Sequence, residues 1–482
     1  MKLDQRLLLP LCLGPLLLVS CNSSDDAKPA APPAALSEEY YAGGLMGTVF
    51  NTTASCYQQP SPAVTDLAAF RRGEAFFDTP YVIGNGTPFS GLGPVYIRKS
   101  CVSCHPGYGR GRRQTDLNVE SGNGYLVFVH NPDGSICTGF TNMLQTHAVA
   151  PFIPPVERVD VAWNLFVDAY NNKYPDGTPY NEGLPYQGTL ISPTASLVNC
   201  ILPLPNNYRV SLEATIGIPG TALLDAIADE TIMAEYDRQQ AAPGSIKGQH
   251  GPWITEPFDG KPHLGKFTFN CARATLENGP GINALYSIFN LTRKDKPKNY
   301  LTPEWVNKML ELGIVDAAGA ADLLADQPEE ITQSDVKDFM IWHRGLAVPA
   351  ARNLDDATVK EGKNLFFSAK CNECHKPSWT TGTYAAMPGY SNQKIWPYTD
   401  LLMHDMGEEN KGRTRLFRTT PLWGRGLMKI AANHTDMFHD LRARNFEEAI
   451  LWHFGEGTAS REAFRNMTKS QRAALIKFLE AI

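Results

Sequence analysis

The sequence predicts a mainly α-helical protein made of two related units, of which the first carries long, loop-rich insertions and a little β-structure. Two observations lead to this prediction. One short motif of two cysteines and a histidine occurs at 101–105 and again at 371–375, and a similar helical pattern precedes each copy. The remaining chain combines helical periodicity with stretches rich in Pro, Gly, Asn and Tyr, which are typical of loops.

The two helical patterns in front of the motifs are related to each other. "FRRGEAFF" (70–77) and "VKEGKNLFF" (359–367) each contain a glycine that is followed three and four residues later by large apolar side chains. This spacing places the apolar pair on one face of a helix. The second helix runs directly into its motif, whereas a glycine-rich loop separates the first helix from its motif. The pattern indicates an internal repeat.

The rest of the chain is organised around these two units. Helical periodicity and capping residues predict helices over 221–237, 302–313 and 468–482, and "GYLVFVH" (124–130) predicts an extended segment. The expected divisions are a signal peptide (1–20), a lipid-anchored tether (21–60), the first unit (61–345), a linker (346–358) and the second unit (359–482).

The N-terminal segment predicts export. Lys2 and Arg6 precede an apolar run that ends in "LVSC" at Cys21, a pattern typical of a lipoprotein signal peptide; an ordinary cleaved secretory signal is the alternative. Acyl chains on Cys21 would hold the protein at a membrane surface without a spanning helix. We therefore expect a protein that is exported, anchored to the membrane through Cys21, and facing the periplasm or the cell surface.

Composition and cysteine count narrow the class of protein. The formal charge is −6 and 20% of the residues are charged, which gives no indication of a nucleic-acid partner. Of ten cysteines, two lie in the signal segment and four in the repeated motif. The remaining four predict two disulfides with three possible pairings, because an exported chain meets an oxidising compartment. These four are Cys56, Cys137, Cys200 and Cys271.

The repeated motif, Cys-x-x-Cys-His, is the sequence pattern of c-type haem attachment. Cysteines three apart project from one side of a helix, so that each thiol can add across one vinyl group of a porphyrin, and the adjacent histidine becomes the proximal iron ligand. A zinc site would need two such pairs close together, and a thioredoxin-like pair needs no histidine. We therefore expect two covalently bound haem c groups, each preceded by a helix as in a cytochrome c domain. The residues are Cys101, Cys104 and His105, and Cys371, Cys374 and His375.

A second axial ligand decides whether a haem transfers electrons or binds a substrate. In "RNFEEAILWHFGEG" (444–457), His453 shares one helical face with Phe446, Ala449 and Ile450 at the spacing i, i+3, i+4 and i+7. A histidine on this apolar stripe can reach the iron of the second haem. A core histidine bound to a backbone carbonyl is the alternative.

Several segments resemble those of a known family. The chain is similar to the di-haem oxidoreductase family of peroxidase-like proteins, some of whose members are labelled thiol oxidoreductases, within the superfamily of bacterial dihaem cytochrome c peroxidases and MauG. The thiol label has no support here, because no Cys-x-x-Cys lies outside the haem motifs. The resemblance spans the mature chain, and its segments are 91–111, 143–149, 346–353, 370–382, 396–407, 417–427 and 438–456.

The resemblance implies two cytochrome c-like haem domains that have different functions. A small redox protein would supply electrons at the C-terminal haem, held by His375 and His453, and hydrogen peroxide would be reduced at the N-terminal haem. His439 is the runner-up to His453, and Met403, Met406 and His404 are weaker candidates. The resemblance places His404 and Asp405 near the haems and also allows a calcium ion between the domains.

The residues that would move protons at the N-terminal haem are harder to place. The peroxidases carry a tryptophan between the haems followed by a glutamine or glutamate, and this chain has Phe267 and Phe269 in the matching region. Glu277 is the nearest candidate, and Gln145 and Glu157 are further candidates. For a distal ligand of the same haem, the candidates are His147 and His130.

The motifs and the resemblance together suggest three alternative functions. The favoured function is a peroxidase-like oxidoreductase. The second is a non-catalytic electron-transfer cytochrome whose two haems are both six-coordinate. The third is a MauG-like oxidation of a partner protein, although His453 stands where MauG has a distal tyrosine.

Overall fold

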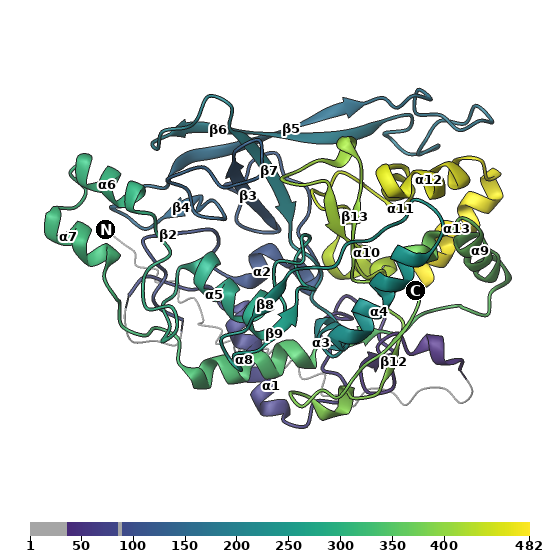
Figure 1. Ribbon diagram of the computed structural model, residues 1–482, viewed down its shortest axis with the longest axis horizontal. Helices are drawn as coiled ribbons and strands as arrows, with labels where there is room; N and C mark the ends of the chain where they lie inside the picture. The colour runs from purple at the N-terminus through teal and green to yellow at the C-terminus, as the bar shows by residue number, and fades with distance from the viewer. Residues whose placement is uncertain (1–35, 85–88) are drawn as a thin grey trace, which may run out of the picture.

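The computed structural model describes residues 36–84 and 89–482 (Figure 1). It is 32% helical and 17% strand, and its sheets are small. The expected mainly α protein is therefore confirmed only in part, because the structure is mixed. The predicted signal peptide, Cys21 and the first part of the tether lie outside the described residues.

Most helices are short (Figure 1). The α-helices of the described chain are α1 (Leu67–Asp78), α2 (Cys101–Cys104), α3 (Thr221–Asp225), α4 (Asp229–Ala241), α5 (Ile282–Phe289), α6 (Pro303–Glu311), α7 (Ala317–Leu324), α8 (Gln333–Gly345), α9 (Ala357–Ser368), α10 (Met428–Ala432), α11 (Phe446–Leu451), α12 (Thr458–Arg465) and α13 (Lys469–Ala481).

The strands form two-stranded sheets throughout the described residues. The pairs are β1 (Thr48–Val49) with β10 (Val348–Pro349), β2 (Val95–Tyr96) with β4 (His147–Ala148), β3 (Tyr125–His130) with β7 (Arg209–Ala214), β5 (Val156–Phe166) with β6 (Leu190–Cys200), β8 (Trp253–Thr255) with β9 (Pro262–Leu264), β11 (Trp379–Thr380) with β12 (Lys394–Ile395), and β13 (Met403–Asp405) with β14 (Leu416–Arg418).

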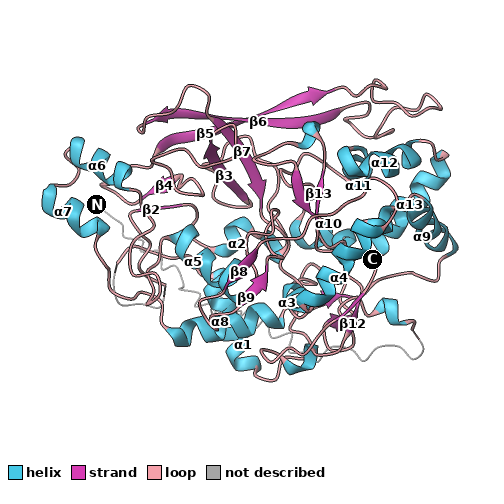
Figure 2. Cartoon of the chain, in the orientation of Figure 1, coloured by secondary structure: helices cyan, strands magenta, loops and turns pink. Residues whose placement is uncertain are grey.

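The long β5–β6 hairpin accounts for most of the strand that the sequence did not predict. It runs along one edge of the molecule, above β3 and β7 (Figure 2). Val156, Val159 and Val161 of β5 are buried against a core that also contains Trp305 of α6, whereas Leu165 near the hairpin tip is exposed. The extended segment predicted at 124–130 forms β3.

The two repeated helices occupy equivalent positions. Helix α1 packs against α8, and α9 packs against α13. At each crossing the repeated glycine allows close contact: a Cβ on Gly73 would lie 2.1 Å from the carbonyl oxygen of Asp338, and one on Gly362 would lie 2.0 Å from that of Ala474. The glycine of the sequence repeat is therefore the residue that lets each helix pair approach.

Residues 38–60, which the sequence assigned to the tether, are folded onto the body of the protein. Tyr40, Cys56 and Tyr57 are buried, and β1 pairs with β10 in the predicted linker. Glu39 accepts hydrogen bonds from Lys363 and Tyr398 in the second unit. Within the described residues, no helix has both the length and the apolar composition needed to cross a bilayer.

Replacing Gly362 by alanine should destabilise the α9–α13 crossing. Alanine favours a helix over glycine by about 1 kcal/mol, but the new Cβ would collide with the Ala474 carbonyl and force the backbones apart, which typically costs about 1–3 kcal/mol. We expect a net loss of up to about 2 kcal/mol, measured as a lower thermal unfolding midpoint. Gly319→Ala in α7 is the control, because the nearest atom there is 3.3 Å away and no loss is expected. An equal or higher midpoint for Gly362→Ala would contradict the close packing.

Candidate functional site

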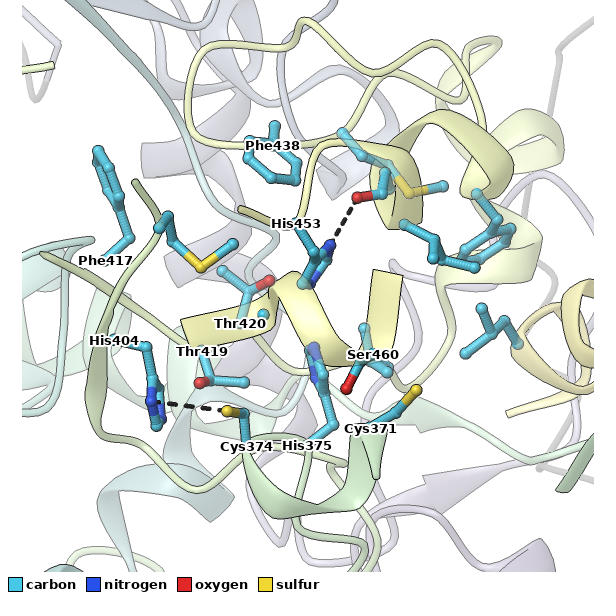
Figure 3. A pocket seen from close by; sticks show the side chains of 18 of the residues that line it. Cys371, Cys374, His375, His404, Phe417, Thr419, Thr420, Phe438, His453 and Ser460 are labelled. Carbon is cyan, nitrogen blue, oxygen red and sulfur yellow. Dashed lines mark hydrogen bonds between the residues drawn. The ribbon is translucent and has the colours of Figure 1, made fainter. Parts of the chain in front are cut away.

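The second motif follows directly from α9 and lines a large cavity. Cys371 and Cys374 lie on and just after a single 3₁₀ turn, and both sulfurs border the cavity with His375 (Figure 3). His375 Nδ1 lies 3.0 Å from the carbonyl oxygen of Tyr398. A carbonyl partner on Nδ1 leaves Nε2 free to ligate a metal and fixes the orientation of the ring.

His453 reaches the same cavity from the opposite side, just beyond α11 (Figure 3). The side chain of Asn445 caps α11 by accepting from the Glu448 N–H, which sets where the helix begins. His453 Nδ1 lies 2.7 Å from the carbonyl oxygen of Ala449, so its Nε2 is also left for a metal.

The separation of His375 and His453 suits one metal ion between them. Their ring centroids are 6.3 Å apart. Two trans metal–nitrogen bonds of about 2 Å, plus about 1.1 Å from each nitrogen to its ring centroid, require about 6 Å. Burial lowers the pKa of both histidines, that of His375 to about 4, so both rings are neutral at physiological pH, as ligation requires.

The cavity beside the second motif opens to solvent. The space between its walls, counted together with the solvent at its mouth, is about 1320 Å³. Its walls are largely apolar, which suits a flat aromatic group. The apolar lining includes Phe366, Phe417, Leu422, Phe438, Phe446, Ile450, Leu475 and Leu479.

Three arginines in this wall lack carboxylate partners. Arg110, Arg418 and Arg425 border the cavity, and none forms an ion pair with a described residue. Burial lowers the pKa of all three guanidinium groups, that of Arg110 to about 9. Arg110 Nε and Arg418 Nη1 are buried without a hydrogen-bond partner in the described chain. A buried cation needs an anion, and the two propionate groups of a haem would supply it.

The first motif is built in a similar way. Cys101 and Cys104 bound α2, and His105 Nδ1 lies 3.0 Å from the carbonyl oxygen of Gly109. Burial lowers the pKa of His105 to about 4, so this ring is also neutral. Around it, the Tyr81 hydroxyl and the Trp342 indole N–H are buried without partners among the described residues. Buried polar atoms that have no protein partner beside the motif fit a site that holds a bound group.

The two sites adjoin through Arg110. This residue follows His105 in the chain by five positions, yet its guanidinium lines the cavity of the second motif and donates to the Phe438 carbonyl at 2.5 Å. A smaller cavity between the sites is bordered by Gly109 and the same three arginines. Phe267 and Trp423 also line it, and Phe269 lines the main cavity.

His404 lies beside the second motif in a charged cluster. Its Nε2 is 2.8 Å from Asp400 and its Nδ1 is 2.7 Å from Glu456 and 3.5 Å from Cys374 Sγ. Although burial opposes the charge, the Asp400 carboxylate and the Cys374 sulfur raise the pKa of His404 well above its usual value. Cys374, Asp400 and His404 also form a potential metal-binding group in the described chain; calcium prefers oxygen ligands, so its predicted binding gains no support here.

Of the predicted catalytic residues, Glu277 lies near the first site. Arg344 donates to Glu277 at 2.5 Å and lies in the last turn of α8, the helix that packs on α1. Gln145 instead donates to the Tyr300 carbonyl at 2.7 Å, and Glu157 lies exposed on the β5–β6 hairpin, where it accepts from Asn199. The catalytic role of all three stays a prediction.

The predicted alternative ligands have other partners. His147 stacks on Tyr96 with ring centroids 5.4 Å apart, and His130 Nε2 lies 2.7 Å from Ser211. His439 lines the main cavity, but its ring is stacked against Phe417 at 4.0 Å. Met406 also lines that cavity. Met403 lies in β13 and is buried, and Asp405 pairs with Arg415 at 2.9 Å.

His343 of α8 is a buried histidine that was not among the site residues predicted from the sequence. Its ring is buried, and neither nitrogen has a partner among the described residues. The signal was present in the sequence: Val336, Phe339, Met340 and His343 repeat the i, i+3, i+4, i+7 pattern that identified His453.

The expectation of two disulfides is wrong. Every cysteine of the described chain has a free thiol. Cys137, Cys200 and Cys271 each direct the sulfur to a separate oxygen acceptor, on Asn131, Leu202 and Leu401 respectively. Cys56 is fully buried, and burial raises its pKa to about 11, so it behaves as an apolar core residue.

A comparison with known families gives one match. The family described as "di-haem oxidoreductase, putative peroxidase" matches residues 200–482, more than half of the chain. This range includes the second motif, His453, His343 and Glu277. No curated protein and no solved structure matches the chain.

Proposed function

Because the chain belongs to the di-haem oxidoreductase family, we propose that it is a peroxidase-like c-type cytochrome with one haem at each Cys-x-x-Cys-His motif. Each thiol adds across a vinyl group: a carbon–sulfur bond forms and the thiol hydrogen moves to the other vinyl carbon, so no oxidant is needed. The observation that carries the proposal is the pair of opposed neutral histidines, His375 and His453, beside two cysteines in a largely apolar cavity.

The helix crossings support two cytochrome c-like units. In each unit a glycine-bearing helix leads toward the motif and packs on the last helix of that unit, α8 or α13. Helix α8 ends at Gly345 and α9 begins at Ala357, so the proposed linker falls between two complete helix pairs.

The two sites are suited to different roles. His375 and His453 would close both faces of the C-terminal haem, which makes it an electron-transfer centre. Electrons from a small redox protein would enter there and pass toward the first site through the region lined by Arg110, Phe267 and Trp423. At the first site haem iron supplies the one-electron chemistry by which hydrogen peroxide, two electrons and two protons become two waters.

Glu277 is the proposed proton carrier at the first site. Arg344 binds one of its carboxylate oxygens, which orients the group for proton transfer. Gln145 and Glu157 have partners that give no such position. The proposed site of action is outside the cytoplasm, with the protein anchored by lipid at Cys21.

The test uses full-length protein produced with a haem-ligation system. We expect two covalent haems per chain and consumption of peroxide with a reduced cytochrome or dye as donor. Glu277→Gln should lower turnover about 10²–10⁴-fold with both haems retained, whereas Glu311→Gln on the exposed face of α6 should match the native protein. Two haems without any peroxide turnover would leave the electron-transfer cytochrome as the function.

A further inference from the structure

The backbone carbonyl of Tyr398 holds the ring of His375 in place. His375 Nδ1 lies 3.0 Å from this oxygen, a contact that fixes the orientation of the ring and makes Nε2 a stronger donor to a metal. Tyr398 has a φ of +53°, in the left-handed region that residues other than glycine rarely adopt. A backbone in this region persists only where its surroundings hold it there. The position of the carbonyl therefore depends on what anchors the Tyr398 side chain.

The side chain of Tyr398 is fully buried, and its hydroxyl contacts Glu39. The ring packs edge-on against Phe366 of α9 and Phe478 of α13, with ring centroids 5.7 and 5.8 Å away. The hydroxyl donates to one carboxylate oxygen of Glu39, and Lys363 of α9 donates to the other. Burial and the Glu39 carboxylate raise the pKa of Tyr398, so the hydroxyl keeps its proton and remains a donor. Glu39 is thus the polar anchor of this side chain.

Glu39 belongs to the N-terminal segment, which lies along the loop that leads to Tyr398. The Trp396 N–H donates to the Ala42 carbonyl at 2.7 Å, two residues before Tyr398. Further along the segment, β1 pairs with β10 in a parallel arrangement. The hydrogen bond between Tyr398 and Glu39 therefore requires that the N-terminal segment is docked on the second unit.

The first unit contains a similar arrangement, but its carboxylates come from its own helix. Tyr108 also has a left-handed backbone, with a φ of +63°, and it precedes Gly109, whose carbonyl oxygen lies 3.0 Å from His105 Nδ1. The Tyr108 hydroxyl lies 3.0 Å from carboxylate oxygens of both Glu74 and Asp78 in α1. A tyrosine held by a carboxylate thus stands beside the motif histidine in each unit.

Helix α9 has no carboxylate at the corresponding positions of the repeat. Glu74 directly follows the repeated glycine of α1, whereas Lys363 follows that of α9, and Phe367 stands where α1 has Asp78. Lys363 instead pairs with Glu39. The second unit therefore takes from the N-terminal segment the carboxylate that the first unit carries in its own helix.

We propose that Glu39 is a positioning residue for the C-terminal haem, acting on His375 through Tyr398, so that the potential of this haem depends on the docked N-terminal segment. This assignment rests on the function proposed above. The hydrogen bond to His375 Nδ1 strengthens the donation of the imidazole to oxidised iron, which lowers the potential. Loss of the Glu39 contact releases the Tyr398 carbonyl, and the potential rises.

The test combines a potentiometric titration of the haem-loaded, full-length protein with electron paramagnetic resonance of its oxidised form. Glu39→Gln should raise the potential of the C-terminal haem and change the g values of its low-spin signal, because the His375 ring is no longer fixed. We expect a change of up to about tenfold in the ratio of oxidised to reduced haem, which corresponds to about 59 mV. Glu38→Gln is the matched control, because this exposed neighbour pairs with Lys394 and should keep both native values. The C-terminal haem is identified as the one whose signal changes in His453→Ala.

Tyr398→Phe tests the route from Glu39 to His375, because it removes the hydroxyl and keeps the ion pair between Glu39 and Lys363. It should reproduce the shift, and the double variant should shift no further than either single variant, since both changes break one contact. A purely structural role of Glu39 would lower the unfolding midpoint without moving the potential or the g values.

Native potential and g values in Glu39→Gln, or additive shifts in the double variant, would overturn the proposal. If Glu39→Gln does not fold, Tyr398→Phe decides alone, and native values in that variant would equally refute it. Mass spectrometry of the same samples counts the covalent haems. Two haems with unshifted values refute the role of Glu39 only, whereas fewer than two haems in the native chain contradict the proposed function itself.

Discussion

Replacing Cys371 and Cys374 together by alanine is expected to halve the covalent haem content of the protein. These two sulfurs border the cavity of the second unit, and no other cysteine within residues 36–84 and 89–482 lines it. His375 and His453 remain in the variant, but coordination alone does not survive denaturation. Mass spectrometry of the denatured chain should therefore find one haem in the variant and two in the native protein.

The same change should also weaken the second unit. A group that binds only the folded state stabilises it, the more so the tighter it binds, and here it would occupy the cavity lined by residues of α9, α11 and α13. Limited proteolysis should cleave residues 359–482 sooner in the variant. Cys200→Ala is the control, because this half-buried thiol lies on β6 away from both motifs, and it should retain two haems. A double variant that still carried two covalent haems would refute attachment at the second motif.

The sequence predicted the parts of the fold that short-range patterns encode. The repeated glycine with its apolar pair identified α1 and α9, and the capping residue Thr468 identified α13. The β5–β6 hairpin escaped prediction because its strands carry many polar residues and are only half-buried, so that their alternation is weak. The folding of residues 38–60 depends on contacts with Lys363 and Val348, far away in the sequence, which no local pattern reveals.

Some residues of the candidate site could likewise be predicted from the sequence, and others could not. Motif spacing and one helical face were enough to select His375 and His453, which the structure brings together. The arginine cluster could not be predicted, because Arg110 lies more than 300 residues before Arg418 and Arg425 in the chain. His343 could have been selected from the sequence, because its helical face has the same spacing as that of His453. His147 and His130 were selected instead, because they follow the first motif closely in the sequence.

Replacing His453 by methionine is expected to raise the midpoint potential of the C-terminal haem. Neutral imidazole donates more strongly to the oxidised iron than a thioether does, and a His/Met pair is the ligand set associated with high potentials. Axial ligands tune haem potentials over about 0.8 V, and we expect a rise of roughly 0.1–0.3 V in a potentiometric titration. His453→Ala should instead leave one iron face open and make that haem high-spin.

His439 provides the decisive comparison for this assignment, because it lines the same cavity and is also neutral, with burial lowering its pKa to about 4. Its ring is stacked on Phe417 at 4.0 Å, an arrangement that holds it against the wall rather than across from His375. His439→Gln should therefore leave the C-terminal haem low-spin and its potential near the native value. If His439→Gln opened the iron while His453→Met left the potential unchanged, the ligand would be His439, and the 6.3 Å spacing between His375 and His453 would reflect packing rather than coordination.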